Sequence, residues 1–217
     1  MSGFKLLISI VPHDKGEKLT RAAMESGCQG GTVLIGRGLA KSNLAAVLGL
    51  GESTKDVVLM VVGKEVKNSV RDAIVQSASS EKRNFGEVFC VDVDSLLKTG
   101  IIAKKDEKEN DMNKNPENEM ITVIVNKGYA DDVMAAARKA GAGGGTVLNA
   151  RGTARETDKR FFGMHIVPEK EMLIIVVASD KKESVMSAIK ELKCLKEPGM
   201  GIAYSSGVED FSLLGKR

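Results

Sequence analysis

The chain has 217 residues, 42% of them hydrophobic and 28% charged, with a formal net charge of +3 and no Trp. These values are typical of a soluble globular protein of one or two domains, and the small charge with 4% aromatic residues argues against nucleic-acid binding. Cys28, Cys90 and Cys194 lie far apart without a C-x-x-C pair, which argues against a disulfide framework or a zinc site. No apolar stretch approaches the about 20 residues of a membrane span, and residues 6–11 lack the features of a signal peptide. We therefore expect a cytoplasmic protein without membrane insertion.

The first half of the chain predicts two helices among four strands. Residues 4–12 form an apolar, β-branched run that ends in Pro, which is typical of a strand. Asp14 and Glu17 fit a capping box for a helix that ends at Gly27. The remaining segments are a strand at 31–39, a loop at 40–55, a strand at 56–63, a helix at 65–79, a polar turn at 81–86 and a strand at 87–93.

The second half repeats this order after a linker. Residues 103–119 are nearly all polar or charged and bury too little apolar surface to order themselves, so we predict a disordered linker at 101–119. Asp180 and Glu183 form another capping-box pair. The order β-α-β-β-α-β in each half is the ferredoxin-like arrangement. The sequence therefore predicts an α+β protein with two ferredoxin-like β-α-β-β-α-β domains in tandem, at residues 1–100 and 120–217.

A nine-residue stretch occurs twice, at 30–38 and 144–152, with seven identical residues and an offset of 114. Each copy reads as a tight turn, an apolar strand and an Arg-Gly pair. A self-match at a fixed long period indicates a duplicated domain. The strands of both halves are almost continuously apolar, whereas a sheet with one solvated face alternates. We therefore expect both sheet faces, and both faces of the repeated strand, to be buried by the other copy or by another chain.

These features together resemble the nitrogen-regulatory PII signal-transduction proteins. The resemblance rests on the doubled β-α-β-β-α-β order, the run QGGTV at 29–33 with its Gly38 exit, the loop between the second and third strands, and the Gly-rich turn at 198–201. It implies a non-enzymatic regulator that forms trimers and binds ATP or ADP, often with 2-oxoglutarate, in clefts between subunits. It also implies that the long loop, called the T-loop, docks onto a transporter or an enzyme.

The resemblance also implies a set of nucleotide-binding residues. A glycine lets backbone N–H groups approach phosphate oxygens, and a nearby cation neutralises them. The implied residues are Thr32 and Thr146 near the adenine; Arg37, Gly38 and Lys41, and Arg151, Gly152, Thr153 and Arg155, at the two T-loop bases; Gly86, Gly199 and Gly201 in the second phosphate turn; and the basic Lys98. In the second loop, a basic pair beside two aromatics predicts a partner-docking segment, made of Lys159, Arg160, Phe161 and Phe162.

Several positions depart from the family pattern. The lysine of the phosphate turn is Glu87 in one copy and Ile202 in the other, and the T-loop glutamine is Ser42 or Glu156. An alternative therefore stays open, a structural or PII-like oligomer that binds a different anion or metabolite without nucleotide sensing. An enzyme is disfavoured because no nucleophile–base pair is visible. His13 and His165 have no partners at metal-ligand spacing, so we expect no metal.

Overall fold

The computed structural model describes residues 3–39, 52–93, 95–98, 101–104, 116–151, 160–161, 164–165, 169–197 and 200–216. Its first half runs β1 (Phe4–Pro12), α1 (Gly16–Glu25), β2 (Thr32–Leu39), β3 (Glu52–Gly63), α3 (Lys67–Ser77) and β4 (Gly86–Val93). A short antiparallel pair follows, β5 (Ser95–Lys98) with β6 (Ile101–Lys104). The first four residues of the predicted linker therefore form β6, and residues 105–115 of it lie outside the described part of the chain.

The second half has the same order with additions in its loop and before its last strand. It runs β7 (Asn118–Asn126), α4 (Ala130–Lys139), β8 (Gly145–Arg151), β9 (Arg160–Phe161), β10 (Met164–His165), β11 (Glu169–Ala178), the 3₁₀ helix η1 (Ser179–Lys181), α5 (Lys182–Lys190), α6 (Lys193–Lys196) and β12 (Gly201–Leu214). The mixed α+β class and the ferredoxin-like order β-α-β-β-α-β are confirmed.

The chain forms two compact units that are not contiguous in sequence. Unit 1 comprises Met1–Ile35, Thr54–Asn118 and Gly207–Arg217, and unit 2 comprises Gly36–Ser53 and Glu119–Ser206. Strands β2 and β12 each contribute one part to unit 1 and the other part to unit 2. A simple tandem of two contiguous domains is thus not confirmed, and the boundaries 1–100, 101–119 and 120–217 stay a prediction.

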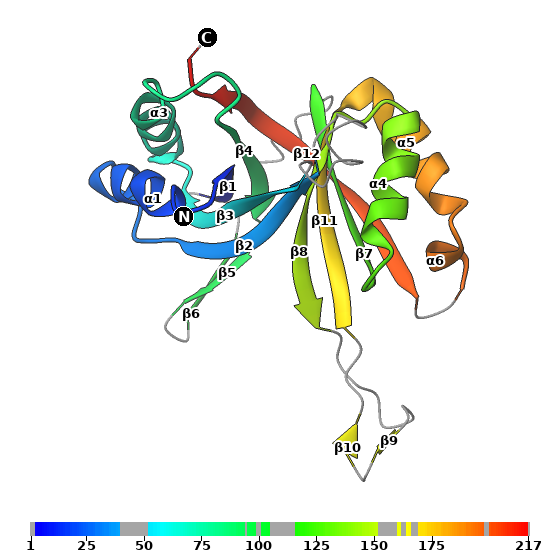
Figure 1. Ribbon diagram of the computed structural model, residues 1–217. Helices are drawn as coiled ribbons and strands as arrows, with labels where there is room; N and C mark the ends of the chain where they lie inside the picture. Colours follow the sequence, from blue (N-terminus) through cyan, green and yellow to red (C-terminus); the bar gives the residue numbers. More distant parts are fainter. Residues whose placement is uncertain are drawn as a thin grey trace. The chain divides into compact units, whose positions relative to one another are not determined.

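In unit 1, the strand order is β2, β3, β1, β4 and then the end of β12. Helices α1 and α3 lie side by side against one face of this sheet (Figure 1). Side chains on alternate positions of β1 point to this face, so Leu7 and Val11 join the helix residues Leu19, Val70 and Ile74 in one buried core.

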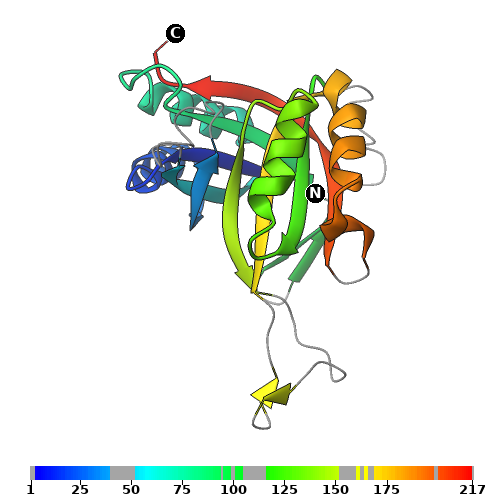
Figure 2. The ribbon, with the colours of Figure 1, turned by 45° about the vertical axis from the view of Figure 1, so that its right-hand side comes forward.

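In unit 2, the order is the end of β2, then β8, β11, β7 and the start of β12. Helices α4 and α5 cover one face, as Figure 2 shows. Their small and aliphatic residues pack on the apolar strands in a second core, which includes Val133, Met134, Ala137, Val147 and Ile175. In each unit, two helices thus pack on one face of the sheet, as the sequence pattern predicts.

The sheet faces away from the helices are also covered at several positions. Ile8, Ile10, Val57 and Phe89 are buried although they do not belong to the core beneath α1 and α3. These side chains are thus buried, and their covering by the other copy or by another chain stays a prediction.

The expectation for the repeated strand is confirmed in only one copy. In the second copy, Thr146 is 5%, Val147 2% and Leu148 6% exposed. In the first copy, Val33 is 40%, Leu34 36% and Ile35 61% exposed, so this chain does not cover them, and their burial by another chain stays a prediction. The physical reason is a neighbouring strand, because residues 36–39 pair antiparallel with 145–148 and cover the second copy.

Candidate functional site

A buried carboxylate lies at the centre of the hydrogen bonds that surround the first turn of α4 in unit 2. Glu171, near the start of β11, is 5% exposed. Its Oε2 accepts hydrogen bonds from the backbone N–H groups of Gly128 at 2.9 Å and Ala130 at 3.2 Å. Ala130 is the first residue of α4, and Gly128 precedes the N-cap residue Tyr129, whose side chain makes no cap. Glu171 therefore satisfies a donor that the first turn of a helix leaves free, together with the N–H just before the cap.

The same arrangement occurs in unit 1. Oδ2 of Asp56 accepts from the N–H of Gly16, the first residue of α1, at 2.9 Å. The predicted capping boxes of Asp14 with Glu17 and of Asp180 with Glu183 are therefore wrong, because α1 and α5 have Lys15 and Lys181 as N-cap residues without side-chain caps. Asp14 adopts a φ of 63°, outside the extended geometry that a capping residue requires.

Arg37 meets this carboxylate from the first copy of the repeat. Its Nη2 lies 3.3 Å from Oε1 of Glu171, and its Nη1 lies 3.2 Å from Oδ1 of Asp131 in α4. Next to it, Gly38 pairs with Thr146 across the β2–β8 ladder. Unit 2 thus brings together Arg37 and Gly38 of the first copy and Thr146 of the second, three residues that the resemblance assigns to nucleotide binding.

The base of the second loop forms a cavity of about 410 Å³, lined by Lys127, Asn149, Ala150, Glu169 and Lys170. Nζ of Lys127 donates to Oε2 of Glu169 at 2.7 Å, and this hydrogen bond raises the pKa of Lys127. Nζ of Lys170 lies 3.5 Å from the carbonyl oxygen of Met200. Since Met200 belongs to the Gly-rich turn, Lys170 joins the loop base to that turn.

Of the other predicted nucleotide residues, Arg151 and Gly201 adjoin the loop base and the Gly-rich turn. Thr32, Gly86 and Lys98 belong to unit 1. The two glycines at 86 and 201 serve packing, because a Cβ on Gly86 would lie 2.3 Å from the Ile10 oxygen and one on Gly201 would lie 2.7 Å from the Cys194 oxygen. Arg151 ends β8 and pairs with Glu169 through its backbone.

Several predicted residues lie outside the described part of the chain. These are Lys41, Gly152, Thr153, Arg155 and Gly199, and Lys159 and Phe162 of the predicted docking segment. Arg160 and Phe161 form β9, which pairs with β10. The docking role of this segment stays a prediction.

Sequence reasoning missed the residues that surround Arg37 and the loop base, namely Lys127, Asp131, Asn149, Glu169, Lys170 and Glu171. One signal was available. Asp56 and Glu171 stand directly before the matching apolar runs 57–62 and 172–177, so a carboxylate precedes the third strand of both halves. Near the first phosphate turn, burial raises the pKa of Glu87, and Lys55 opposes this shift.

Neither a membrane-spanning helix nor a metal-binding cluster occurs among the described residues. No described helix is long and apolar enough to cross a membrane. The same residues contain no group of three His, Cys, Asp or Glu side chains that could hold a metal ion.

Comparisons with known proteins agree with the resemblance in the second half. The family model described as nitrogen regulatory protein P-II matches residues 118–214. No curated protein matches the chain. Among solved structures, the crystal structure of Arabidopsis thaliana PII bound to citrate is 24% identical, with a TM-score of 0.40, and the match covers 49% of this chain and 92% of that one.

Proposed function

We propose that the chain is a non-enzymatic signal-transduction regulator of the type described as nitrogen regulatory protein P-II, the family whose model matches residues 118–214. In our proposal it binds an adenine nucleotide, ATP or ADP, at the base of the second loop in unit 2. The loop between β8 and β11 then transmits the bound state to a target transporter or enzyme. The protein acts in the cytoplasm as a trimer of two-domain chains.

The observation that carries the ligand proposal is the contact of Lys170 with Met200. It joins the loop base to the Gly-rich turn, and the adjoining cavity also contains Lys127 and Asn149. Ammonium groups bind phosphate oxygens, and an amide side chain both donates and accepts hydrogen bonds. The cavity can therefore hold an anionic group with polar surroundings.

Arg37 is a further cation near the loop base, but it already pairs with carboxylates and has to leave them before it binds a ligand phosphate. Its guanidinium already lies on Glu171 and Asp131. A phosphate that binds Arg37 has to compete with these carboxylates, and the N–H groups of Gly128 and Ala130 keep Glu171 in place. We propose that nucleotide binding moves Arg37 away from Asp131, which is the more exposed of the two acids.

Titration calorimetry of the intact protein with ATP, ADP and AMP tests the ligand proposal. Lys170→Gln should weaken nucleotide binding by about tenfold, since each charge-assisted contact contributes on the order of 1.5–3 kcal/mol. Lys193→Gln is the matched control, because Lys193 is an exposed lysine of the same unit, in α6. The absence of heat and of any stability change with all three nucleotides would contradict nucleotide binding, and light scattering tests the trimer.

A second candidate function is binding of a different anion or metabolite without nucleotide sensing. The pairing of Arg37 with two acids favours it, as does Glu87 at a position where the family pattern has lysine. Citrate and inorganic phosphate titrated under the same conditions separate the two functions. Binding of these anions that Lys170→Gln weakens, without nucleotide binding, would support this second candidate.

A further inference from the structure

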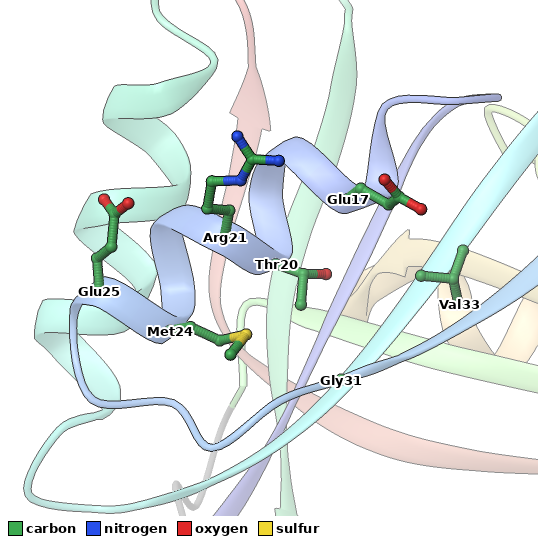
Figure 3. Close-up of a pocket in the computed structure, with 7 residues that line it drawn as sticks. All are labelled: Glu17, Thr20, Arg21, Met24, Glu25, Gly31 and Val33. Carbon is green, nitrogen blue, oxygen red and sulfur yellow. The ribbon is translucent and has the colours of Figure 1, made fainter.

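Unit 1 contains an apolar pocket beside the exposed start of β2. Figure 3 shows that it is formed by one side of α1 and by the strand below it. Its volume is about 640 Å³, and its lining residues are Glu17, Thr20, Arg21, Met24, Glu25, Gly31 and Val33. Met24 is 52% and Val33 40% exposed, so large apolar side chains here face solvent. Exposed apolar surface beside a strand edge is typical of an interaction site.

The repeat provides a filled counterpart of this pocket in unit 2. With the offset of 114, Glu17 corresponds to Asp131, Gly31 to Gly145 and Val33 to Val147, whereas the helix residues differ: Thr20, Arg21, Met24 and Glu25 correspond to Met134, Ala135, Arg138 and Lys139. At the counterpart, residues 36–39 lie along 145–148 as an antiparallel strand. Val147 is only 2% exposed, against 40% for Val33. The matching valines of the repeated strand thus differ in burial because one of them has a strand alongside it.

Residues 36–39, which cover the counterpart in unit 2, show which side chains fit that site. Leu39 pairs with Gly145 and belongs to the buried core with Met134 and Val147. Two residues earlier, Arg37 binds Asp131 at 3.2 Å. Side chains two residues apart on a strand point to the same face. One strand therefore places an aliphatic side chain in the apolar site and a basic side chain on the acid of the helix.

We propose that the pocket of unit 1 docks an extended segment of a partner protein, which pairs with β2 at residues 31–35. The segment carries a large aliphatic side chain that packs on Met24 and Val33, and a basic side chain two residues before it that binds Glu17. The rim favours this charge, because Glu17 and Glu25 outnumber Arg21.

A second copy of this chain fits the pocket less well. Its own residues 36–39 already pair with 145–148, and its other matching segment is Arg151-Gly152-Thr153, with Thr153 in place of Leu39. A threonine adds a hydroxyl group and lacks the volume of leucine, so it would leave the apolar pocket poorly filled. The proposal does not depend on ligand binding by unit 2.

The test uses a labelled, blocked peptide with the sequence of residues 33–39, VLIGRGL, and the intact protein. Fluorescence anisotropy should show saturable binding, with Kd on the order of 100 µM for so short a strand. Met24→Lys should weaken it by at least about tenfold, because the apolar contact is lost. Ile202→Lys should leave it unchanged; Ile202 is an apolar residue of β12 with 59% exposure, close to that of Met24. Thermal melting verifies that both variants fold.

A charge exchange tests the basic contact. Glu17→Lys should weaken binding of the peptide by about threefold or more, and a peptide with Glu in place of its Arg should recover most of that loss. Failure of the recovery would overturn the assigned contact. Binding that survives Met24→Lys would place the peptide elsewhere and overturn the proposal, as would absence of binding at about tenfold the expected Kd. Self-association that Met24→Lys abolishes, without peptide binding, would identify a second copy as the occupant instead.

Discussion

Nζ of Lys5 lies 2.8 Å from the carboxylate of Glu209, 204 residues later in the chain. Lys5 is only 3% exposed, and its second partner is Asp92 in β4 at 2.6 Å. These contacts hold the last part of β12 in unit 1. At the position in unit 2 that corresponds to Lys5, the first strand has Glu119, which pairs with Lys182 at 3.3 Å. The two units thus carry opposite charges at this position, and of these two side chains only Lys5 of unit 1 pairs with the acidic Glu209 of β12.

Loss of the buried lysine should destabilise unit 1. Lys5→Met removes the buried cation that Asp92 and Glu209 share, and we expect the free energy of unfolding to fall by about 2–4 kcal/mol. Urea denaturation measures this change. Lys18→Met is the matched control, because Lys18 also makes a 2.7 Å ion pair, with Glu81, but is 43% exposed. It should cost less than about 1 kcal/mol. Equal losses in the two variants would contradict a special role for the buried pair.

Close backbone packing at Gly36 should make its replacement costly. A Cβ at this position would lie 2.7 Å from the Val147 oxygen and 2.8 Å from a methyl carbon of Leu148. Gly36→Ala should therefore strain the β2–β8 ladder and lower the free energy of unfolding by about 1–3 kcal/mol in urea titrations. The corresponding residue of the second copy is Ala150, and Ala150→Gly should cost less than about 1 kcal/mol. A neutral Gly36→Ala would show that the ladder does not depend on this close approach.

The order of elements was predictable because it depends on local patterns. The apolar run that ends at Pro12 gives β1 with the predicted bounds, Phe4–Pro12, and the helical spacing of Val70 and Ile74 gives α3. The strand reads as a continuous apolar run, and the helix buries one face of its own sequence. Such periodicity is a property of a short segment, so no knowledge of distant residues is needed.

The caps and the site were not predictable in this way. Local spacing suggested that Asp14 caps α1, whereas the cap comes from Asp56, 40 residues beyond Gly16. Val33 and Val147 have near-identical neighbours in sequence, yet only Val147 is buried, because residues 36–39 lie beside it. Contacts of this kind depend on which strands pair, and local sequence does not contain that information.

The cysteine thiols should be unreactive in the native protein. All three cysteines are free and buried, and burial raises the pKa of Cys90 to about 12. Burial also raises the pKa of Cys194. Since the thiolate is the reactive form, a thiol-specific reagent at neutral pH should label none of them rapidly in the folded protein and all three after denaturation. Rapid labelling of one thiol in the native state would show that its segment opens easily, and mass spectrometry would identify it.

His13 should make the stability of unit 1 depend on pH. Its Nδ1 lies 2.8 Å from Oδ1 of Asp56, and its Nε2 lies 3.3 Å from Asp14. The hydrogen bond to Asp56 raises the pKa of His13 above its usual 6.5, and the charges of Asp14 and Asp56 act in the same direction. The protonated imidazole therefore stabilises the folded state fully below the unfolded-state pKa, and this contribution is lost as the pH rises through the folded-state pKa.

The matching experiment compares wild type with His13→Gln by urea denaturation. The wild type should exceed the variant in free energy of unfolding by more at about pH 5 than at about pH 8, because only the protonated form gains from Asp56. Proton NMR titration of the His13 ring should give a pKa above that of a free histidine, and Asp56→Asn should lower it. Asp56→Asn also removes the carboxylate at the start of α1, so its effect on stability should persist at the higher pH. A stability difference between wild type and His13→Gln that stays constant across this range would contradict the coupling of His13 to Asp56.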